Sequence, residues 1–328
     1  MRAIGIPALI FTALEIVLLD MGVVTAQTAT TGSGQAYPSK SIRIITQEVG
    51  GSGDFMSRQI ALGLTGPLGQ PVIVDNRPTR IAREIGAKAA ADGYSLYQDG
   101  SAFWLAPFLE KMPYDPVRDY APISLLTQAP NVLVVHPSVT VKSVSELIAL
   151  AKAKPGVLNY ASAVSGSASH LSAELFKSMG GVTIVRVPYQ GNAPALTALM
   201  SGESQILFAS AGAVTPQLKS DRLRALAVTS SQPSSLFPGL PTIAGSGLPG
   251  FEYVSSFGIF VPAKTPAPVI TLLNREIVRV ITRPEIKQRF FGQGLEVVGS
   301  TPDELAARVR SEITSVGKVI KDAGIKPD

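Results

Sequence analysis

The chain has 328 residues, long enough for two lobes that each bury a core, and 45% of them are hydrophobic against 16% charged, as in a folded globular protein. The net charge is +5, but the basic residues are scattered and form no run that alternates with aromatic residues, so we expect no nucleic-acid partner. The absence of cysteine excludes disulfides, thiolate nucleophiles, cysteine metal sites and a lipid attached to an N-terminal cysteine.

Residues 1–26 have the pattern of a secretory signal peptide. Arg2 precedes an apolar stretch that extends to Leu19, and Val24-Thr25-Ala26 supplies the small residues of a cleavage site. The stretch is short and contains Glu15, which argues against a membrane span, although an uncleaved anchor is the alternative. We therefore predict export, with the small and polar residues 27–36 as a flexible lead-in.

From Tyr37 onward, short apolar runs alternate with helical periodicity. Met56, Ile60 and Leu64 lie at every fourth position and predict a helix. The predicted strands cover residues 42–46, 72–75, 132–135, 158–160, 183–187, 205–208 and 224–228. This alternation is typical of βαβ units and predicts an α/β fold with mostly parallel sheets flanked by helices.

Capping residues predict where several helices begin. Ser143 with Glu146 and Thr301 with Glu304 have the spacing of capping boxes. The helix after Thr301 carries an apolar stripe from Leu305 to Ile320. Another helix is predicted from about Ser169 to Gly180, where glycine permits the left-handed conformation that ends a helix. The segment before Ser169 therefore lies at a helix N-terminus.

No linker composition divides the chain, so its division into lobes must come from the topology. We place the crossings between lobes near residues 135–137 and 253–261. Lobe I is then discontinuous, with residues 37–135 and 258–328, and lobe II contains residues 136–257. A ligand cleft is expected between them.

The first candidate binding segment is Gly50-Gly51-Ser52-Gly53-Asp54, between a predicted strand and a helix. Free amides and the positive end of the helix dipole would favour an anion there. Glycines permit a close backbone approach, and Asp54 could cap the helix. The alternative is a tight turn that simply requires glycine.

The second candidate segment covers residues 162–170, before the helix that starts near Ser169. Ser162, Ser165, Gly166 and Ser167 offer hydroxyls and amides that could hold an ionised carboxylate. His170 fits either a ligand contact or local capping. The alternative for the whole segment is a solvated loop.

Two further segments follow predicted strands. Tyr189 and Gly191 precede an Asn-capped helix, although Tyr189 fits a core position equally well. Ser101 follows Asp99-Gly100 and leads into Phe103 and Trp104, which could form a cleft wall or pack in the core.

The sequence gives little indication of a catalytic site or a cofactor site. Neither Ser52 nor Ser167 lies in a G-x-S-x-G nucleophile elbow, and no dinucleotide or phosphate-loop motif occurs. The two histidines, His136 and His170, have no cysteine or paired acids beside them to hold a metal. We predict no enzyme activity, cofactor or metal.

Short motifs in order along the chain resemble the Bug family of periplasmic solute-binding proteins. They are Tyr37-Pro38-Ser39-Lys40, Gly69-Gln70-Pro71-Val72, Asp75-Asn76-Arg77-Pro78, Asp92-Gly93-Tyr94, Pro113-Tyr114-Asp115-Pro116-Val117, Leu158-Asn159-Tyr160-Ala161-Ser162, His170-Leu171, Val187-Pro188-Tyr189, Leu223-Arg224-Ala225-Leu226-Ala227-Val228-Thr229 and Leu240-Pro241-Thr242. The resemblance implies a periplasmic receptor of a tripartite tricarboxylate transporter. It also implies a two-lobed periplasmic-binding-protein fold, no cofactor, and a small carboxylate held in the cleft between the lobes.

This chain departs from the family pattern at three places. The family's Pro-Phe-x-Pro is Thr46-Gln47-Glu48-Val49 here, so an aromatic wall is missing where Gln47 lies. A glycine-rich loop after Pro78 is shorter by about three residues. Many members have Asp-Asn where this chain has Ala209-Ser210, which removes a carboxylate and favours a more anionic ligand.

We therefore predict a monomeric solute-binding protein that delivers a small organic carboxylate to the integral membrane components of a tripartite tricarboxylate transporter. The alternative is an extracytoplasmic receptor that signals to a membrane sensor. The predicted ligand-binding residues are Gln47, Gly50, Gly51, Ser52, Gly53, Asp54, Ser101, Ser162, Ser165, Gly166, Ser167, His170, Tyr189, Gly191 and Ser210.

Overall fold

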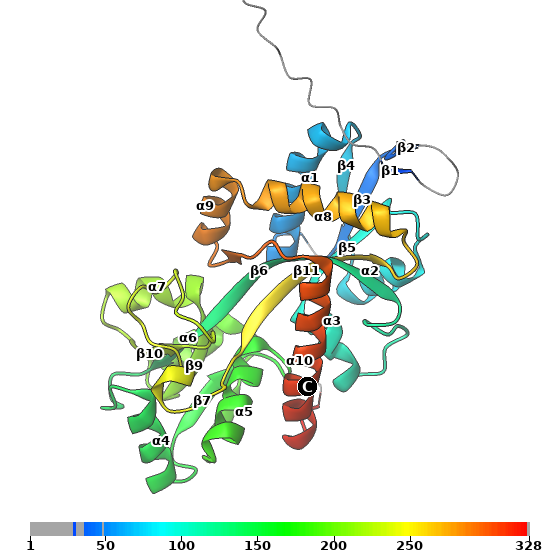
Figure 1. The fold of residues 1–328 in the computed structure, drawn as a ribbon. Helices are drawn as coiled ribbons and strands as arrows, with labels where there is room; N and C mark the ends of the chain where they lie inside the picture. The colour runs from blue at the N-terminus through cyan, green and yellow to red at the C-terminus, as the bar shows by residue number, and fades with distance from the viewer. Residues whose placement is uncertain (1–28, 31–35, 48, 327–328) are drawn as a thin grey trace, which may run out of the picture.

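The computed structural model describes residues 29–30, 36–47 and 49–326. The predicted signal peptide and most of the predicted lead-in lie outside these residues. Within the described part of the chain, no helix is both long and apolar enough to cross a membrane. The fold is α/β and two-lobed, with one ten-stranded sheet through both lobes and helices packed around it (Figure 1). A separate pair of short strands, β1 (Ala29–Thr30) and β2 (Ala36–Tyr37), lies near the start.

Three parallel strands form the sheet of the first lobe, in the order β4 (Val72–Asn76), β3 (Ile42–Thr46) and β5 (Ser95–Gly100). Both faces of β3 are buried. Ile44 packs in a cluster with residues of α1 (Ser52–Leu68) and α8 (Ala267–Ile281). Ile45 faces α2 (Thr79–Lys88) and α3 (Ser101–Leu105). Apolar residues on both faces are typical of a parallel strand, and β3 matches the predicted range 42–46.

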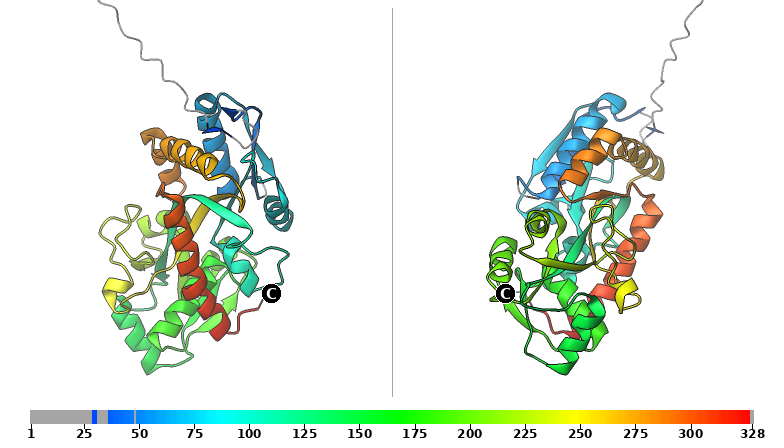
Figure 2. Two further views of the ribbon diagram at one scale, coloured as in Figure 1. Left: turned by 45° about the vertical axis from the view of Figure 1, so that its right-hand side comes forward. Right: turned by 90° about the vertical axis from the view of Figure 1, so that its left-hand side faces the viewer.

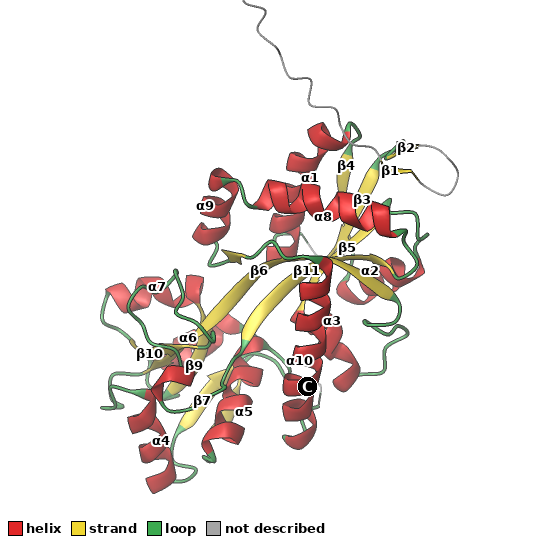
Figure 3. Cartoon of the chain, in the orientation of Figure 1, coloured by secondary structure: helices red, strands yellow, loops and turns green. Residues whose placement is uncertain are grey.

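The second lobe repeats this arrangement with β8 (Val185–Pro188), β7 (Asn159–Ser162) and β9 (Ile206–Ser210), which are parallel. One face is covered by α4 (Val144–Ala153) and α5 (Ala168–Gly180), and the other by α6 (Asn192–Met200) and α7 (Ala211–Lys219). The remaining elements are β10 (Arg224–Val228), β12 (Glu296–Val297), α9 (Pro284–Gly292) and two 3₁₀ turns, Ala106–Phe108 and Ala244–Ser246. Figure 3 shows the helices around the central strands.

Two strands connect the lobes. The 16-residue β6 (Tyr120–Val135) pairs with β11 (Val254–Pro262) along its first part and with β9 and β10 along its last five residues. The sequence predicted only residues 132–135 of β6. All pairs made by β6 and β11 are antiparallel, and they add to the predicted parallel pairs. The residue boundaries of the lobes remain a prediction.

Helix α10 (Pro302–Asp322) extends from the first lobe along the second (Figures 1 and 2). Its predicted capping box is confirmed, because Thr301 Oγ1 accepts from the Glu304 N–H and the Glu304 carboxylate accepts from the Thr301 N–H. Leu305 and Ile320, at either end of its predicted apolar stripe, belong to one buried cluster that also contains residues of α3 and α5. The two lobes therefore share a core on this side.

Two helix ends differ in detail from their predictions. Ser143 Oγ accepts from the Glu146 N–H at 3.1 Å, as predicted, but the Glu146 carboxylate accepts from the Lys142 N–H and not from Ser143. Helix α5 includes Gly180, and the residue in the left-handed conformation is Gly181, with φ +58°. In each case the backbone group that completes the cap belongs to a residue one position away from the predicted one.

Candidate functional site

A cavity of about 210 Å³ lies where the starts of α3 and α5 meet β11. It is lined by Gln47, Asp99, Gly100, Ser101, Ala102, Leu105, Leu109, Gly166, Ser167, Ala168, Leu171, Tyr253, Ser255 and Phe257. Of the predicted binding residues, the cavity brings together Gln47, Ser101, Gly166 and Ser167. These four come from both predicted lobes.

The first-lobe wall is formed where β5 ends at Gly100 and α3 begins at Ser101. Ser101 Oγ accepts from the Ser256 N–H at 3.0 Å and lies 3.4 Å from the Ser256 carbonyl, to which it donates. These bonds hold the start of α3 against the crossing strand β11. Side-chain and backbone polar atoms of this wall therefore lie at fixed positions beside the cavity.

A buried carboxylate, Asp99, supports this wall. It accepts from Arg83 Nε at 3.0 Å, from the Gly100 N–H at 2.7 Å, and from the Tyr97 hydroxyl and the Gln47 side-chain amide. Burial by itself lowers the pKa of the Arg83 guanidinium, but the adjacent Asp99 carboxylate raises that pKa above its ordinary value. The Asp99 charge is thus paired with a buried cation.

The second-lobe wall is the loop that begins α5. Gly166 has φ +75°, and its N–H donates to His170 Nδ1 at 3.2 Å. Ser167 is the N-cap residue, and its Oγ accepts from the His170 N–H at 3.4 Å. His170 is 4% exposed and lies outside the cavity lining. Of the two alternatives for His170, the geometry supports local capping.

Arg186, on β8, lies beneath the same loop and was not among the predicted residues. Its Nε donates to Ser162 Oγ at 2.8 Å and its Nη1 to Ser165 Oγ at 2.9 Å, while Nη2 donates to the Ala163 carbonyl at 3.1 Å. Ser162 and Ser165 therefore bind a guanidinium and lie outside the cavity lining. The sequence placed Arg186 in a predicted strand, 183–187, but only the pairing of β8 with β7 brings it to this loop.

The glycine loop at the start of α1 also lies outside the lining. The Gly50 N–H donates to Asp54 Oδ2 at 3.0 Å, and Gly51 and Ser52 are exposed. A Cβ on Gly53 would lie 2.8 Å from both Gln98 Oε1 and Thr46 Oγ1. Close packing against β3 and β5 thus explains Gly53, as in the tight-turn alternative.

The other predicted residues lie apart from the cavity. Tyr189 packs against the apolar cluster that contains Leu199 of α6, which supports its core alternative. Gly191, with φ +122°, is the N-cap residue of α6 in place of the predicted Asn192, and Ser210 is the exposed N-cap residue of α7. None of the three lines the cavity.

The sequence did not predict the apolar part of the lining, formed by Leu105, Leu109, Leu171, Tyr253 and Phe257. Leu171 lies one helical turn after Ser167, and Phe257 lies two residues after Ser255 on β11, so each shares a face with a polar lining residue. Among the described residues that line the cavity there is no Lys, Arg or His. An anion there would be held by amides and hydroxyls. In the described part of the chain, no three His, Asp or Glu side chains are grouped as a metal site would require.

Asp54 gives a pH-dependent test of the local structure. Burial raises its pKa, but bonds from Arg58, the Gly50 N–H and Asn76 together bring the pKa below its ordinary value. Since the folded pKa is lowered, the contribution of Asp54 to stability is complete above about pH 4 and is lost as the pH falls through the folded pKa.

We therefore expect Asp54→Asn to lower the free energy of unfolding at pH 7, and this difference from the wild type to shrink at pH 3. Urea unfolding at both pH values measures it. An equal difference at the two pH values would contradict this role.

Comparison with known proteins shows which proteins this chain resembles in sequence and structure. A family model described as the tripartite tricarboxylate transporter family receptor matches residues 56–325. The protein BugT of Bordetella pertussis is 36% identical over 316 residues, which are 94% of this chain and 97% of that protein. A structure of an R. palustris protein with adipate has 34% identity and a TM-score of 0.71, covering 89% of this chain and all of the other. MatC from Rhodopseudomonas palustris, solved with bound malate, has 28% identity and a TM-score of 0.67, covering 87% of this chain and all of MatC.

Proposed function

The chain belongs to the family of tripartite tricarboxylate transporter receptors, and from this we propose that it captures a small organic carboxylate in the cavity between α3 and α5 and delivers it to the membrane components of such a transporter. The members of this family are periplasmic solute-binding proteins, and the chain is a receptor and not an enzyme. Export through residues 1–26 is part of the proposal, as is a monomeric state.

One observation carries the proposal: the starts of two helices, one from each predicted lobe, border the same cavity. Ala102 of α3 and Ala168 of α5 line the cavity in the first turn of each helix, where backbone N–H groups have no acceptor within the helix. Backbone N–H groups at helix starts favour negative charge. Charge-assisted hydrogen bonds from neutral donors contribute about 1.5–3 kcal/mol each.

The apolar walls favour a carboxylate with a hydrocarbon body. Leu105, Leu109, Leu171 and Phe257 would contact methylene or ring carbons, and burial of each methylene contributes about 0.8 kcal/mol. The R. palustris relative solved with adipate, a four-methylene dicarboxylate, supports this ligand class. Closure of the lobes about β6 and β11 would replace the water around the bound carboxylate.

A ligand panel tests the proposal. Calorimetry and thermal unfolding with C4–C8 mono-, di- and tricarboxylates should find saturable, one-to-one binding by at least one acid. A ligand at 100 times its Kd should add about 2.7 kcal/mol to the free energy of unfolding. The matching neutral diamides serve as controls and should not bind. If no carboxylate stabilises the protein, the proposal is wrong.

A further inference from the structure

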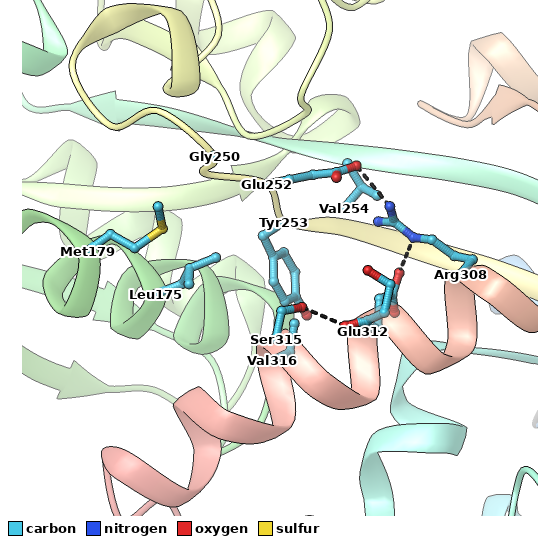
Figure 4. Close-up of a pocket in the computed structure, with 11 residues that line it drawn as sticks. Leu175, Met179, Gly250, Glu252, Tyr253, Val254, Arg308, Glu312, Ser315 and Val316 are labelled. Atoms are coloured by element: carbon cyan, nitrogen blue, oxygen red, sulfur yellow. Dashed lines mark hydrogen bonds and ion pairs between the residues drawn. The ribbon is translucent and has the colours of Figure 1, made fainter.

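A second cavity of about 220 Å³ lies beside the first, between α5, the segment Gly250–Val254 and α10 (Figure 4). Its polar wall contains an ion-pair cluster. Arg308 Nη1 lies 2.9 Å from a Glu252 oxygen, and Arg308 Nε lies 2.6 Å from Glu312 Oε1. Two carboxylates against one guanidinium leave this wall with a net negative charge.

The two cavities follow one another along α5. Leu171 lines the first cavity, and Leu175 and Met179 line the second. Residues four positions apart lie on one face of a helix, about 6 Å further along its axis for each step. The cavities therefore adjoin the same face of α5, one turn apart.

Tyr253 lies at the boundary, because it lines both cavities. Its side chain is buried, with 5% of the residue exposed, and its N–H donates to the Thr229 carbonyl at 2.9 Å. Figure 4 shows its ring between α5 and α10, level with Leu175 and Val316. Burial raises the pKa of its hydroxyl, with a smaller contribution from Glu312, so the side chain is neutral at physiological pH.

We infer that the Tyr253 ring is the partition that sets the maximum length of the ligand, by closing the apolar end of the first cavity. The inference rests on the proposed function, because it takes the carboxylate to be held at the starts of α3 and α5. Without the ring, the hydrocarbon body could extend along Leu175 into the second cavity. A ligand that ends in a methyl group should bind there better than one that ends in a second carboxylate. The reason is repulsion, because the two negative charges of Glu252 and Glu312 exceed the one positive charge of Arg308.

The test measures affinity by calorimetry for straight-chain monocarboxylates and dicarboxylates of four to ten carbons. For the wild type, affinity should rise with chain length and then fall once the chain reaches Tyr253. For Tyr253→Ala, the monocarboxylate maximum should move by about two carbons. Because each buried methylene is worth about fourfold in affinity, two of them should raise the ratio of the affinity for the longer acid to that for the shorter acid by about fifteenfold. Dicarboxylates of the same length should gain less.

Two matched variants separate the partition from general loosening. Tyr253→Phe keeps the ring, and Leu175→Ala enlarges the second cavity while the partition stays in place. Both should keep the wild-type length profile. Tyr253→Leu serves in place of the alanine variant if circular dichroism shows that the latter is unfolded, and it should shift the profile in the same direction.

An unchanged length profile in a folded ring-deletion variant would overturn the inference while leaving carboxylate binding intact. The same conclusion follows if Leu175→Ala alone extends the profile. A wild-type protein that binds none of the acids would instead refute the proposed function, and the inference with it.

Discussion

Replacing Arg83 with methionine should lower the free energy of unfolding by about 3–5 kcal/mol, because it leaves a buried carboxylate without its cation. The side chains of Arg83 and Asp99 are only 7% and 3% exposed, and their ion pair spans 3.0 Å between Nε and Oδ2. Methionine has a similar length, so the main loss is the charge and its hydrogen bond. Urea unfolding measures the change, with the fluorescence of the only tryptophan, the buried Trp104, as the signal.

The same helix offers a matched control. Arg80 lies 3.6 Å from Glu84, with side chains 67% and 33% exposed. Arg80→Met should change the free energy of unfolding by less than about 1 kcal/mol, as expected for an exposed pair. In Arg83→Met/Asp99→Asn, removal of the unpaired charge should restore part of the lost stability. Equal effects of Arg80→Met and Arg83→Met would show that the buried pair has no special role.

Replacing Gly166 with alanine should reduce the affinity for the carboxylate by roughly tenfold or more, which corresponds to about 1.4 kcal/mol. A Cβ at this position would lie 2.6 Å from Leu109 Cδ1, on the opposite wall of the cavity. The leucine must therefore move, and the added methyl group lies at the wall that the ligand approaches. The left-handed φ of +75° also costs a residue with a Cβ about 1–2 kcal/mol in stability.

Gly156 provides the control for backbone strain. Its φ of +74° nearly equals that of Gly166, and no atom lies within 4 Å of the position of its Cβ. It lies before β7, at the opposite end of that strand from the loop that lines the cavity. Gly156→Ala should therefore lose similar stability and keep wild-type affinity. Equal affinity losses in the two variants, measured by calorimetry, would mean that the loss arises from instability and not from the cavity.

Local patterns in the sequence were sufficient for several of the individual elements. The β-branched run over residues 42–46 predicted β3 because both faces of this parallel strand are buried. Thr301 and Glu304 predicted the start of α10 because the capping box depends on residues only three positions apart. Long-range pairing was harder to predict. Most of β6 was missed because its pairing with β11 joins residues more than a hundred positions apart, and Pro122 and Pro130 interrupt its pattern.

Only part of the cavity lining could be predicted, because much of it depends on contacts between residues far apart in the sequence. The glycines at residues 50–53 predicted a binding loop, but these residues do not line the cavity. A side chain at Gly53 would instead clash with Thr46 and Gln98. Ser101 and Ser167, which line the cavity, could be predicted because each lies where a strand gives way to a helix. The apolar walls and the Asp99–Arg83 pair were not found, because only the folded chain brings α2, α3, α5 and β11 together.

A crystal structure of the protein with its tightest carboxylate tests the central claim most directly. The ligand's carboxylate should lie within hydrogen-bonding distance of the polar groups of Ser101 and Ser167, with its carbon chain against Leu105 and Leu171. A carboxylate bound elsewhere, with both helix starts facing only water, would contradict the assignment of this cavity as the receptor site.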